Sequence, residues 1–93
     1  MVIMIADDEY DIRNLIKISL EDNGYKVLLA ENGKKAWELF SNHHIDLAIL
    51  DINMPVIDGF RLIRKIREKS TIPVIFLTTR TDEIDKVVGL NLG

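Results

Sequence analysis

The stretch LAILDINMP, residues 47–55, decides the fold of this chain. It begins as an apolar run, reaches a carboxylate at Asp51 and arrives at a proline, Pro55, four residues later. Three other short apolar runs occur in the sequence: VIMIA at 2–6, KVLLA at 26–30 and PVIFLT at 73–78. Runs that are apolar almost throughout are typical of strands in a parallel sheet that helices cover on both faces.

The segments between these runs repeat apolar residues at helical spacing, which predicts that strands and helices alternate. The four stripes are Ile12, Leu15, Ile16 and Leu20; Ala36, Leu39 and Phe40; Leu62, Ile63 and Ile66; and Ile84, Val87 and Val88. Gly24 follows the first stripe where a left-handed residue would end a helix, and Asn32 and Asp58 are suited to cap the next two. We therefore predict an α/β, doubly wound parallel sheet of order βαβαβαβα.

Composition narrows the class of protein. Ninety-three residues, 47% of them hydrophobic, suit one small globular domain. The formal net charge of −3 gives no reason to expect binding to nucleic acid or to an anionic membrane. The chain has no cysteine, no apolar run that could span a bilayer and no signal-peptide pattern. We expect a cytoplasmic protein without a disulfide framework.

Polar side chains follow three of the predicted strands. Asp7 and Asp8 follow the first strand, Asp51 ends the third, and Thr78 and Thr79 end the fourth. Each has an ordinary structural explanation, as a helix cap, a turn residue or a strand former. Taken together they lie where parallel α/β folds place their sites, beyond the carboxyl ends of the strands.

A cluster of carboxylates at this edge predicts a magnesium site. Two carboxylates about 4 Å apart repel each other by roughly 4 kcal/mol at an effective dielectric constant near 20. A hard divalent cation removes that cost, and Mg²⁺ suits a site of one or two carboxylates and several waters. A carboxylate beside it could act as a nucleophile toward phosphorus.

Three segments resemble the receiver domain of two-component response regulators: IMIADDEYDIRNLI, DLAILDINMPVIDGFRLIRKIR and TIPVIFLTTRTDEIDKVVGLNLG. The resemblance runs from residue 2 to the end, and LDINMPVIDG is its most specific element. The last segment is similar to the subfamily whose receivers precede a winged-helix DNA-binding domain. The resemblance implies a flavodoxin-like fold, a sensor histidine kinase as partner, and DNA contact only through an output domain that these residues do not include.

The resemblance also implies a role for each site residue. Asp51 matches the phospho-acceptor, and Asp7 and Asp8 match the acidic pair that holds Mg²⁺. Asn53 matches the position whose backbone carbonyl completes the metal site, and Thr78 matches the switch hydroxyl that moves toward the phosphoryl group.

The resemblance implies roles for two further positions. Thr79 replaces the alanine of many relatives, and its backbone N–H could still contact the phosphate. By the same resemblance, Arg80 and Asn53 are expected to flank the entrance of the site.

The chain departs from the family's pattern at its C-terminal end. Complete receivers have a fifth strand and helix, and a lysine at that strand pairs with the phosphoryl group. Residues 1–93 contain four of the five βα units, so we expect a C-terminally incomplete receiver whose phosphorylation is impaired. In the family's strand order 2-1-3-4-5, strand 73–78 would become an uncovered edge through which the chain could self-associate.

Other classes of protein remain open on the residues alone. An aspartate-nucleophile phosphatase would share the strand-end carboxylate, but usually has an acid where Asn53 stands. A flavodoxin-like FMN binder would need a phosphate loop where ADDEYD would repel phosphate. An interaction module with a vestigial acidic Mg²⁺ pocket is the third alternative.

Two groups of basic or titratable residues have plainer explanations. His43 and His44 stand at a helix end and have no partner at metal-ligand spacing. A basic face of the third helix is interpreted as solvated, with an acidic partner as the alternative. It comprises Arg61, Arg64, Lys65, Arg67 and Lys69.

Trp37 is predicted to pack at the rim of the core.

Overall fold

The computed structural model describes residues 1–77 and the backbone of residues 87–90. These described residues form a five-stranded sheet in the order β2-β1-β3-β4-β5, with three helices. The elements are β1 (Val2–Ala6), α1 (Tyr10–Asp22), β2 (Lys26–Ala30), α2 (Gly33–Asn42), β3 (Leu47–Asp51), α3 (Gly59–Arg67), β4 (Val74–Leu77) and β5 (Val87–Leu90). The first four strands are parallel, so the predicted α/β, flavodoxin-like architecture and its order 2-1-3-4 are confirmed.

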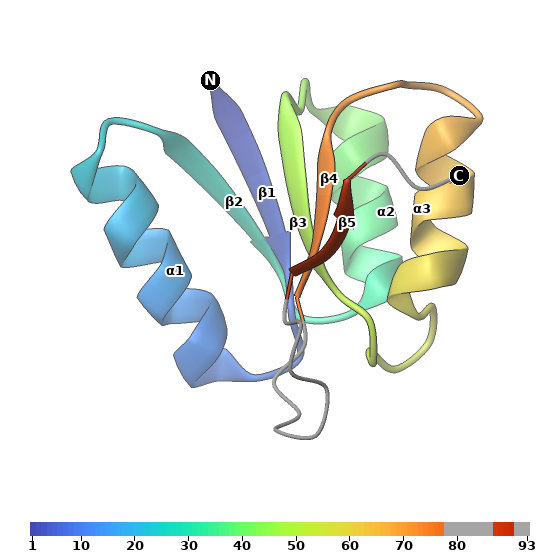
Figure 1. The fold of residues 1–93 in the computed structure, drawn as a ribbon, viewed down its shortest axis with the longest axis horizontal. Coiled ribbons are helices and arrows are strands. Elements are labelled where there is room, and N and C mark those ends of the chain that lie inside the picture. The colour runs from blue at the N-terminus through green and yellow to red at the C-terminus, as the bar shows by residue number, and fades with distance from the viewer. Residues whose placement is uncertain (78–86, 91–93) are drawn as a thin grey trace.

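Helices cover the two faces of the sheet unequally. Figure 1 shows α1 on one face and α2 with α3 on the other. Side chains alternate between the faces along each strand, so Met4 and Ala6 enter the larger core under α2 and α3, whereas Ile3 and Ile5 enter the smaller core under α1. Phe76 of β4 is fully buried in the larger core. The near-continuous apolar runs therefore follow from burial on both faces.

The helix ends agree with the predicted signals. Gly24 has φ of +89° directly after α1, a conformation that glycine adopts without a steric cost. The Asn32 side chain accepts a hydrogen bond from the N–H of Lys35 at 2.8 Å, and the Asp58 side chain accepts one from Arg61 at 2.8 Å. Both caps satisfy amide groups that the first turn of a helix leaves without a partner.

One residue of the first predicted stripe does not enter the core. Leu15 is 63% exposed, whereas Ile16 and Leu20 pack against the smaller core. Because α1 buries no residue completely, only a narrow strip of its surface contacts the sheet. The four-residue stripe overstated the width of the buried face.

The predicted fourth helix is wrong where the structure describes it. Val87 and Val88 belong to β5, which pairs with β4 in the antiparallel direction, with Leu77 opposite Val87. Residues 78–86, including Ile84 of the predicted stripe, lie outside the described residues. Since β5 hydrogen-bonds along β4, the segment 73–78 is not the uncovered edge that the sequence led us to expect.

None of the helices in the described part of the chain is both long enough and apolar enough to cross a bilayer.

Candidate metal and phospho-acceptor site

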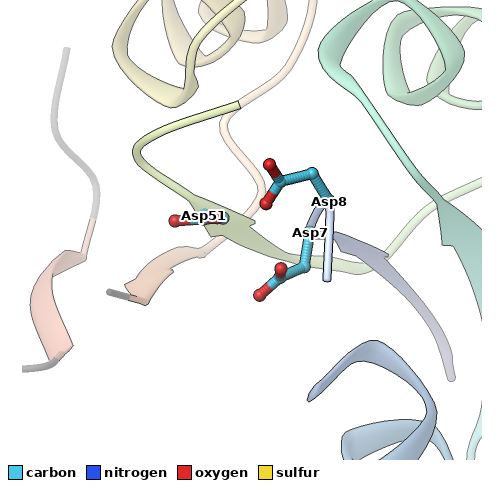
Figure 2. Close-up of side chains that lie close together, drawn as sticks. All are labelled: Asp7, Asp8 and Asp51. Carbon is cyan, nitrogen blue, oxygen red and sulfur yellow. The ribbon is translucent and has the colours of Figure 1, made fainter. Parts of the chain in front are cut away.

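Strand register brings the acidic residues together. Ala6 of β1 lies opposite Leu50 of β3, so the next residues, Asp7 and Asp51, emerge side by side at the carboxyl edge of the sheet. Asp8 follows on β1, and one side-chain oxygen of each of the three aspartates lies within 4.8 Å of the others. Figure 2 shows Asp7 and Asp8 leaving the end of β1 on opposite sides, with Asp51 beside them on β3. The predicted cluster is confirmed.

Asp51 is held firmly in the pocket. Its side chain is 5% exposed, and its Oδ1 accepts a hydrogen bond from the backbone N–H of Asn53 at 3.2 Å. Burial raises the pKa of Asp51 to about 6, against the lowering effect of the Asn53 N–H, and the charges of Asp7 and Asp8 raise it further. The residue therefore ionises only at the expense of desolvation and repulsion by its neighbours.

Asp7 has an oxygen without a partner. The residue is 1% exposed, and its Oδ1 accepts a hydrogen bond from the N–H of Glu9 at 2.8 Å. Its Oδ2 is buried and has no hydrogen-bond partner within the described residues. Burial raises the pKa of Asp7, partly offset by the Glu9 N–H. A buried carboxylate oxygen without a donor is costly unless something else pairs with it.

Arg13 lies close to the pocket but does not neutralise it. Arg13 of α1 donates a hydrogen bond from Nη1 to the backbone carbonyl of Asp7 at 2.8 Å, not to a carboxylate. Of the groups that shift the pKa of Asp7, Arg13 has the smallest effect, and its charge lowers that pKa. The pocket thus combines three carboxylates with no ion pair to any of them among the described residues.

The residues present fit a hard divalent cation. The orphan Oδ2 of Asp7, the exposed Asp8 and the buried Asp51 offer oxygen ligands on one edge of the sheet. A cation would pair with the orphan oxygen and remove the repulsion that raises the pKa of Asp51. The acidic cluster is of the kind that binds Mg²⁺.

The loop between β3 and α3 fixes Asp51 from behind. A Cβ added to Gly59 would lie 2.6 Å from the backbone oxygen of Asp51, so only glycine lets α3 begin this close to the strand. The Gly59 N–H also donates to the carbonyl of Ile52 at 3.0 Å. The family resemblance implies that Gly59 forms the turn that lets the third helix start close to the site, and this close approach confirms the expectation.

A strained turn lies in the same loop. The N–H of Ile57 donates to the carbonyl of Pro55 at 2.9 Å across Val56, whose φ is +72°. This is a γ-turn with a positive φ, a rare conformation that is unfavourable for a β-branched residue. A Cβ on Gly33 would collide with the backbone of Ile57, so the turn also fixes where α2 begins. No local sequence signal predicted this turn.

Several predicted site residues are not tested by the described part of the chain. Thr78, Thr79 and Arg80 lie outside the described residues. Asn53 is exposed, and the contact seen is its N–H to Asp51, so the metal role of its carbonyl stays a prediction.

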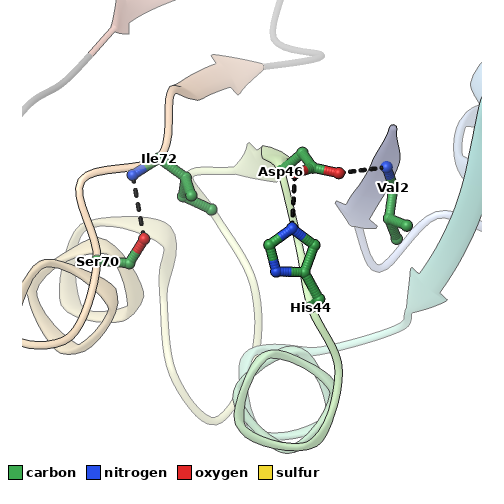
Figure 3. Close-up of polar contacts among 5 residues, drawn as sticks. All are labelled: Val2, His44, Asp46, Ser70 and Ile72. Carbon is green, nitrogen blue, oxygen red and sulfur yellow. Dashed lines mark hydrogen bonds and ion pairs between the residues drawn. The ribbon is translucent and has the colours of Figure 1, made fainter.

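The two histidines lie away from the acidic pocket. His44 pairs through Nε2 with Asp46 Oδ1 at 2.8 Å, and Asp46 also accepts the N–H of Val2 at 2.8 Å (Figure 3). This small network joins the start of β3 to the start of β1, while Ser70 accepts the N–H of Ile72 at 3.2 Å before β4. A structural role for His44 is therefore supported.

Comparison with known proteins agrees with this geometry. Residues 3–93 match the family described as response regulator receiver domain. The chain is a response regulator receiver domain. As such it is a phospho-acceptor signalling domain of two-component systems and not a classical enzyme.

Similar proteins extend well beyond the receiver. The domain is 44% identical over 91 residues to response regulator GtcR of Aneurinibacillus migulanus, covering 98% of this chain and 38% of that protein. It is 42% identical to regulatory protein VanR of Enterococcus faecium, covering 98% of this chain and 39% of that protein. The receiver thus spans about two fifths of the length of these relatives.

Among solved structures, the receiver is similar to response regulator protein TrrA from Thermotoga maritima, crystallised in complex with Mg(2+)-BeF. The TM-score is 0.81 at 39% identity, and the match covers 90% of this chain and 74% of that one.

Proposed function

We propose that Asp51 accepts a phosphoryl group and that Asp7, Asp8, Asp51 and the backbone carbonyl of Asn53 hold Mg²⁺ beside it. The observation that carries the proposal is the group of three aspartates whose oxygens lie within 4.8 Å of one another, with one buried oxygen left without a donor. A similar protein, TrrA, was crystallised in complex with Mg(2+)-BeF, which supports Mg²⁺ as the metal.

The acceptor step needs an ionised and well-positioned carboxylate. A side-chain oxygen of Asp51 attacks phosphorus, forming an acyl phosphate, while the bond from phosphorus to the donor's leaving group breaks and that group takes the electron pair. The Asn53 N–H on Oδ1 and the close approach of Gly59 hold the carboxylate in place. Bound Mg²⁺ supplies charge neutralisation for the incoming phosphoryl oxygens.

The ionisation of Asp51 sets the pH range of the step. Its pKa of about 6 means that a large fraction of the carboxylate is already charged at neutral pH, even without a cation. Phosphoryl transfer otherwise requires mainly positioning. The roles of Thr78 as switch hydroxyl and of Thr79 as a backbone donor to the phosphate belong to this proposal and follow Leu77 in the chain.

The partners of the domain are also proposed. The donor is the phosphohistidine of a sensor histidine kinase, as expected for a receiver. Several relatives have names that describe transcriptional regulators, which supports an output on DNA through another domain. Phosphorylation adds about 1.5–2 negative charges at Asp51 and would bias a surface that this partner domain reads. The predicted impairment of the 93-residue chain stays a prediction.

Intact mass spectrometry after incubation with acetyl phosphate tests the acceptor. We expect one phosphoryl mass on the wild-type chain with Mg²⁺, added at a rate lowered by the predicted impairment, and none after chelation with EDTA. Asp51→Asn should abolish the label, because the amide cannot attack phosphorus, and Asp8→Ala should abolish it through loss of a metal ligand. Asp22→Asn makes the same chemical change on the exposed end of α1 and should leave labelling unchanged.

Two results would overturn the assignment. Labelling of Asp51→Asn to the wild-type level would place the acceptor elsewhere. Mg²⁺ binding to the wild-type chain without any phosphoryl uptake would favour the alternative of an interaction module with a vestigial metal pocket.

A further inference from the structure

The basic face of α3 borders a cleft that the phospho-acceptor site does not use. Arg61, Arg64 and Lys65 are spaced three and four residues apart, so they share one side of the helix. With Ile57 they line a cleft of about 240 Å³. At about 30 Å³ for each water in the liquid, this space takes one or two side chains but not a drug-sized ligand.

The positive charges at this cleft have no acidic partner in the part of the chain that the structure describes. No ion pair to Arg61, Arg64 or Lys65 is formed among the described residues. Asp58 is the nearest acid in the sequence, and its Oδ1 is engaged by the backbone N–H of Arg61. Glu68 follows on the same helix and is exposed, yet it forms no ion pair with these cations. Among residues 1–77 the cluster is therefore a positive patch without an ion-pair partner, on a chain of net charge −3.

An aromatic side chain extends the cleft toward α2. The Nζ atoms of Lys65 and Lys69 lie 5.0 and 5.5 Å from the centre of the Trp37 ring. Trp37 is half-buried and stacks on Phe40, with ring centres 5.8 Å apart. Cation–π contact of this kind holds the lysine stems over an apolar surface and keeps the charges at the rim. The surface is thus cationic at its edge and apolar beneath.

We propose that this cleft, lined by Ile57, Arg61, Arg64 and Lys65 beside Trp37, docks an acidic segment of a partner protein. Arginine forks bind carboxylates in a bidentate manner, and two arginines one turn apart suit two carboxylates of one segment. Ile57 lines the cleft and Trp37 lies beside Lys65, so both offer apolar contact to an aliphatic side chain of the segment. The inference concerns a face outside the acidic pocket and does not depend on phosphoryl transfer.

A nucleic acid fits the same surface less well. The three cations of the cleft lie on one nine-residue helix. The affinity for a duplex rises with the number of phosphates that a protein neutralises, so a longer row of cations would be expected for nucleic acid. A contact with the phosphate backbone would also leave the apolar side chains of Ile57 and Trp37 without a partner. Protein carboxylates are therefore the favoured ligand.

Trp37 is the single tryptophan of the chain and reports on the cleft directly. Titration of the full chain with the blocked peptide ELEDLE, followed by Trp37 emission, should give a saturable change that weakens with added salt. The uncharged peptide QLQNLQ should give none. The double variant Arg61→Gln, Arg64→Gln should bind ELEDLE about tenfold or more weakly, since each charged hydrogen bond is lost. Both arginines are exposed, so the fold should be retained, as circular dichroism would verify.

The matched control removes two positive charges elsewhere. Lys17→Gln, Lys26→Gln changes the net charge equally on α1 and β2, and its affinity for ELEDLE should stay within about twofold of wild type. Three results would overturn the proposal: no saturable response, equal binding of QLQNLQ, or equal loss of affinity in both double variants. Displacement of the peptide by a short DNA duplex that binds more tightly would identify the ligand as nucleic acid instead.

Discussion

Replacing Asp51 by asparagine should stabilise the metal-free domain, increasingly so as the pH rises. The wild-type carboxylate is buried beside two other acids, so its pKa is raised from 3.8 to about 6 on folding. A group whose pKa is raised on folding adds stability below its unfolded pKa and loses it as the pH rises through the folded value. Asparagine keeps an oxygen that can accept the Asn53 N–H at Oδ1, but it carries no charge.

The size of the effect follows from the two pKa values. The folded and unfolded values differ by about 2 units, and at 1.36 kcal/mol a unit the full cost of ionising Asp51 in the fold is about 3 kcal/mol. About half of that develops between pH 5 and pH 7.5, because the unfolded carboxylate is already ionised at the lower pH. Asp7 titrates in the same pocket, so the measured difference belongs to the coupled pair.

Urea denaturation in EDTA, followed by Trp37 emission and circular dichroism, provides the assay. The free energy of unfolding of the wild type should fall relative to that of Asp51→Asn as the pH is raised from about 5 to about 7.5, by about 1–2 kcal/mol. Added Mg²⁺ should stabilise the wild type and have a much smaller effect on the variant. The exposed Asp22→Asn should follow the wild-type profile. Parallel pH profiles for wild type and Asp51→Asn would refute the reasoning.

Two further substitutions test the loop that supports the site, and a third tests the tie between the starts of β1 and β3. Gly59→Ala should lower the free energy of unfolding by about 1–3 kcal/mol, because its Cβ would press on the Asp51 carbonyl, and urea denaturation measures it. Val56→Gly should raise it by about 1 kcal/mol by relieving the positive φ. The hydrogen bond from the Val2 N–H lowers the pKa of Asp46, so the ionised carboxylate stabilises the fold above pH 3.8. Asp46→Asn should lose this stability, and its free energy of unfolding should therefore fall less steeply than that of the wild type as the pH is lowered.

Each of these has a result that would contradict it. Wild-type stability in Gly59→Ala would mean that α3 does not rest against Asp51. A destabilised Val56→Gly would show that the turn stores no strain at that residue. An unchanged acid limb in Asp46→Asn would deny the tie between β1 and β3.

Much of the fold was predictable because burial leaves a local record. The four apolar runs became parallel strands, and the capping residues Asn32 and Asp58 act as predicted. The prediction of a helix at residues 87–90 failed because Val87 and Val88 are apolar and β-branched, and a short apolar stripe fits a strand as well as a helix. Leu15 misled because periodicity does not reveal how much of a helix contacts the sheet.

The residues of the site could be predicted from the sequence, but their burial, their pKa values and the strained backbone nearby could not. Strand ends alone brought Asp7, Asp8 and Asp51 to one edge, since parallel strands finish together. The orphan oxygen of Asp7 and the raised pKa of Asp51 depend on burial by residues distant in the sequence. The strained turn at Val56 depends on packing between loops, for which a single sequence carries no pattern.

Locating the phosphoryl group on the chain is the direct test of whether Asp51 is the acceptor. Borohydride converts an acyl phosphate of aspartate into homoserine, so tandem mass spectrometry of the reduced, Mg²⁺- and acetyl phosphate-treated chain identifies the acceptor. The account predicts homoserine at position 51 and unmodified aspartate at Asp7 and Asp8. Homoserine at either of those two positions, with Asp51 intact, would contradict it.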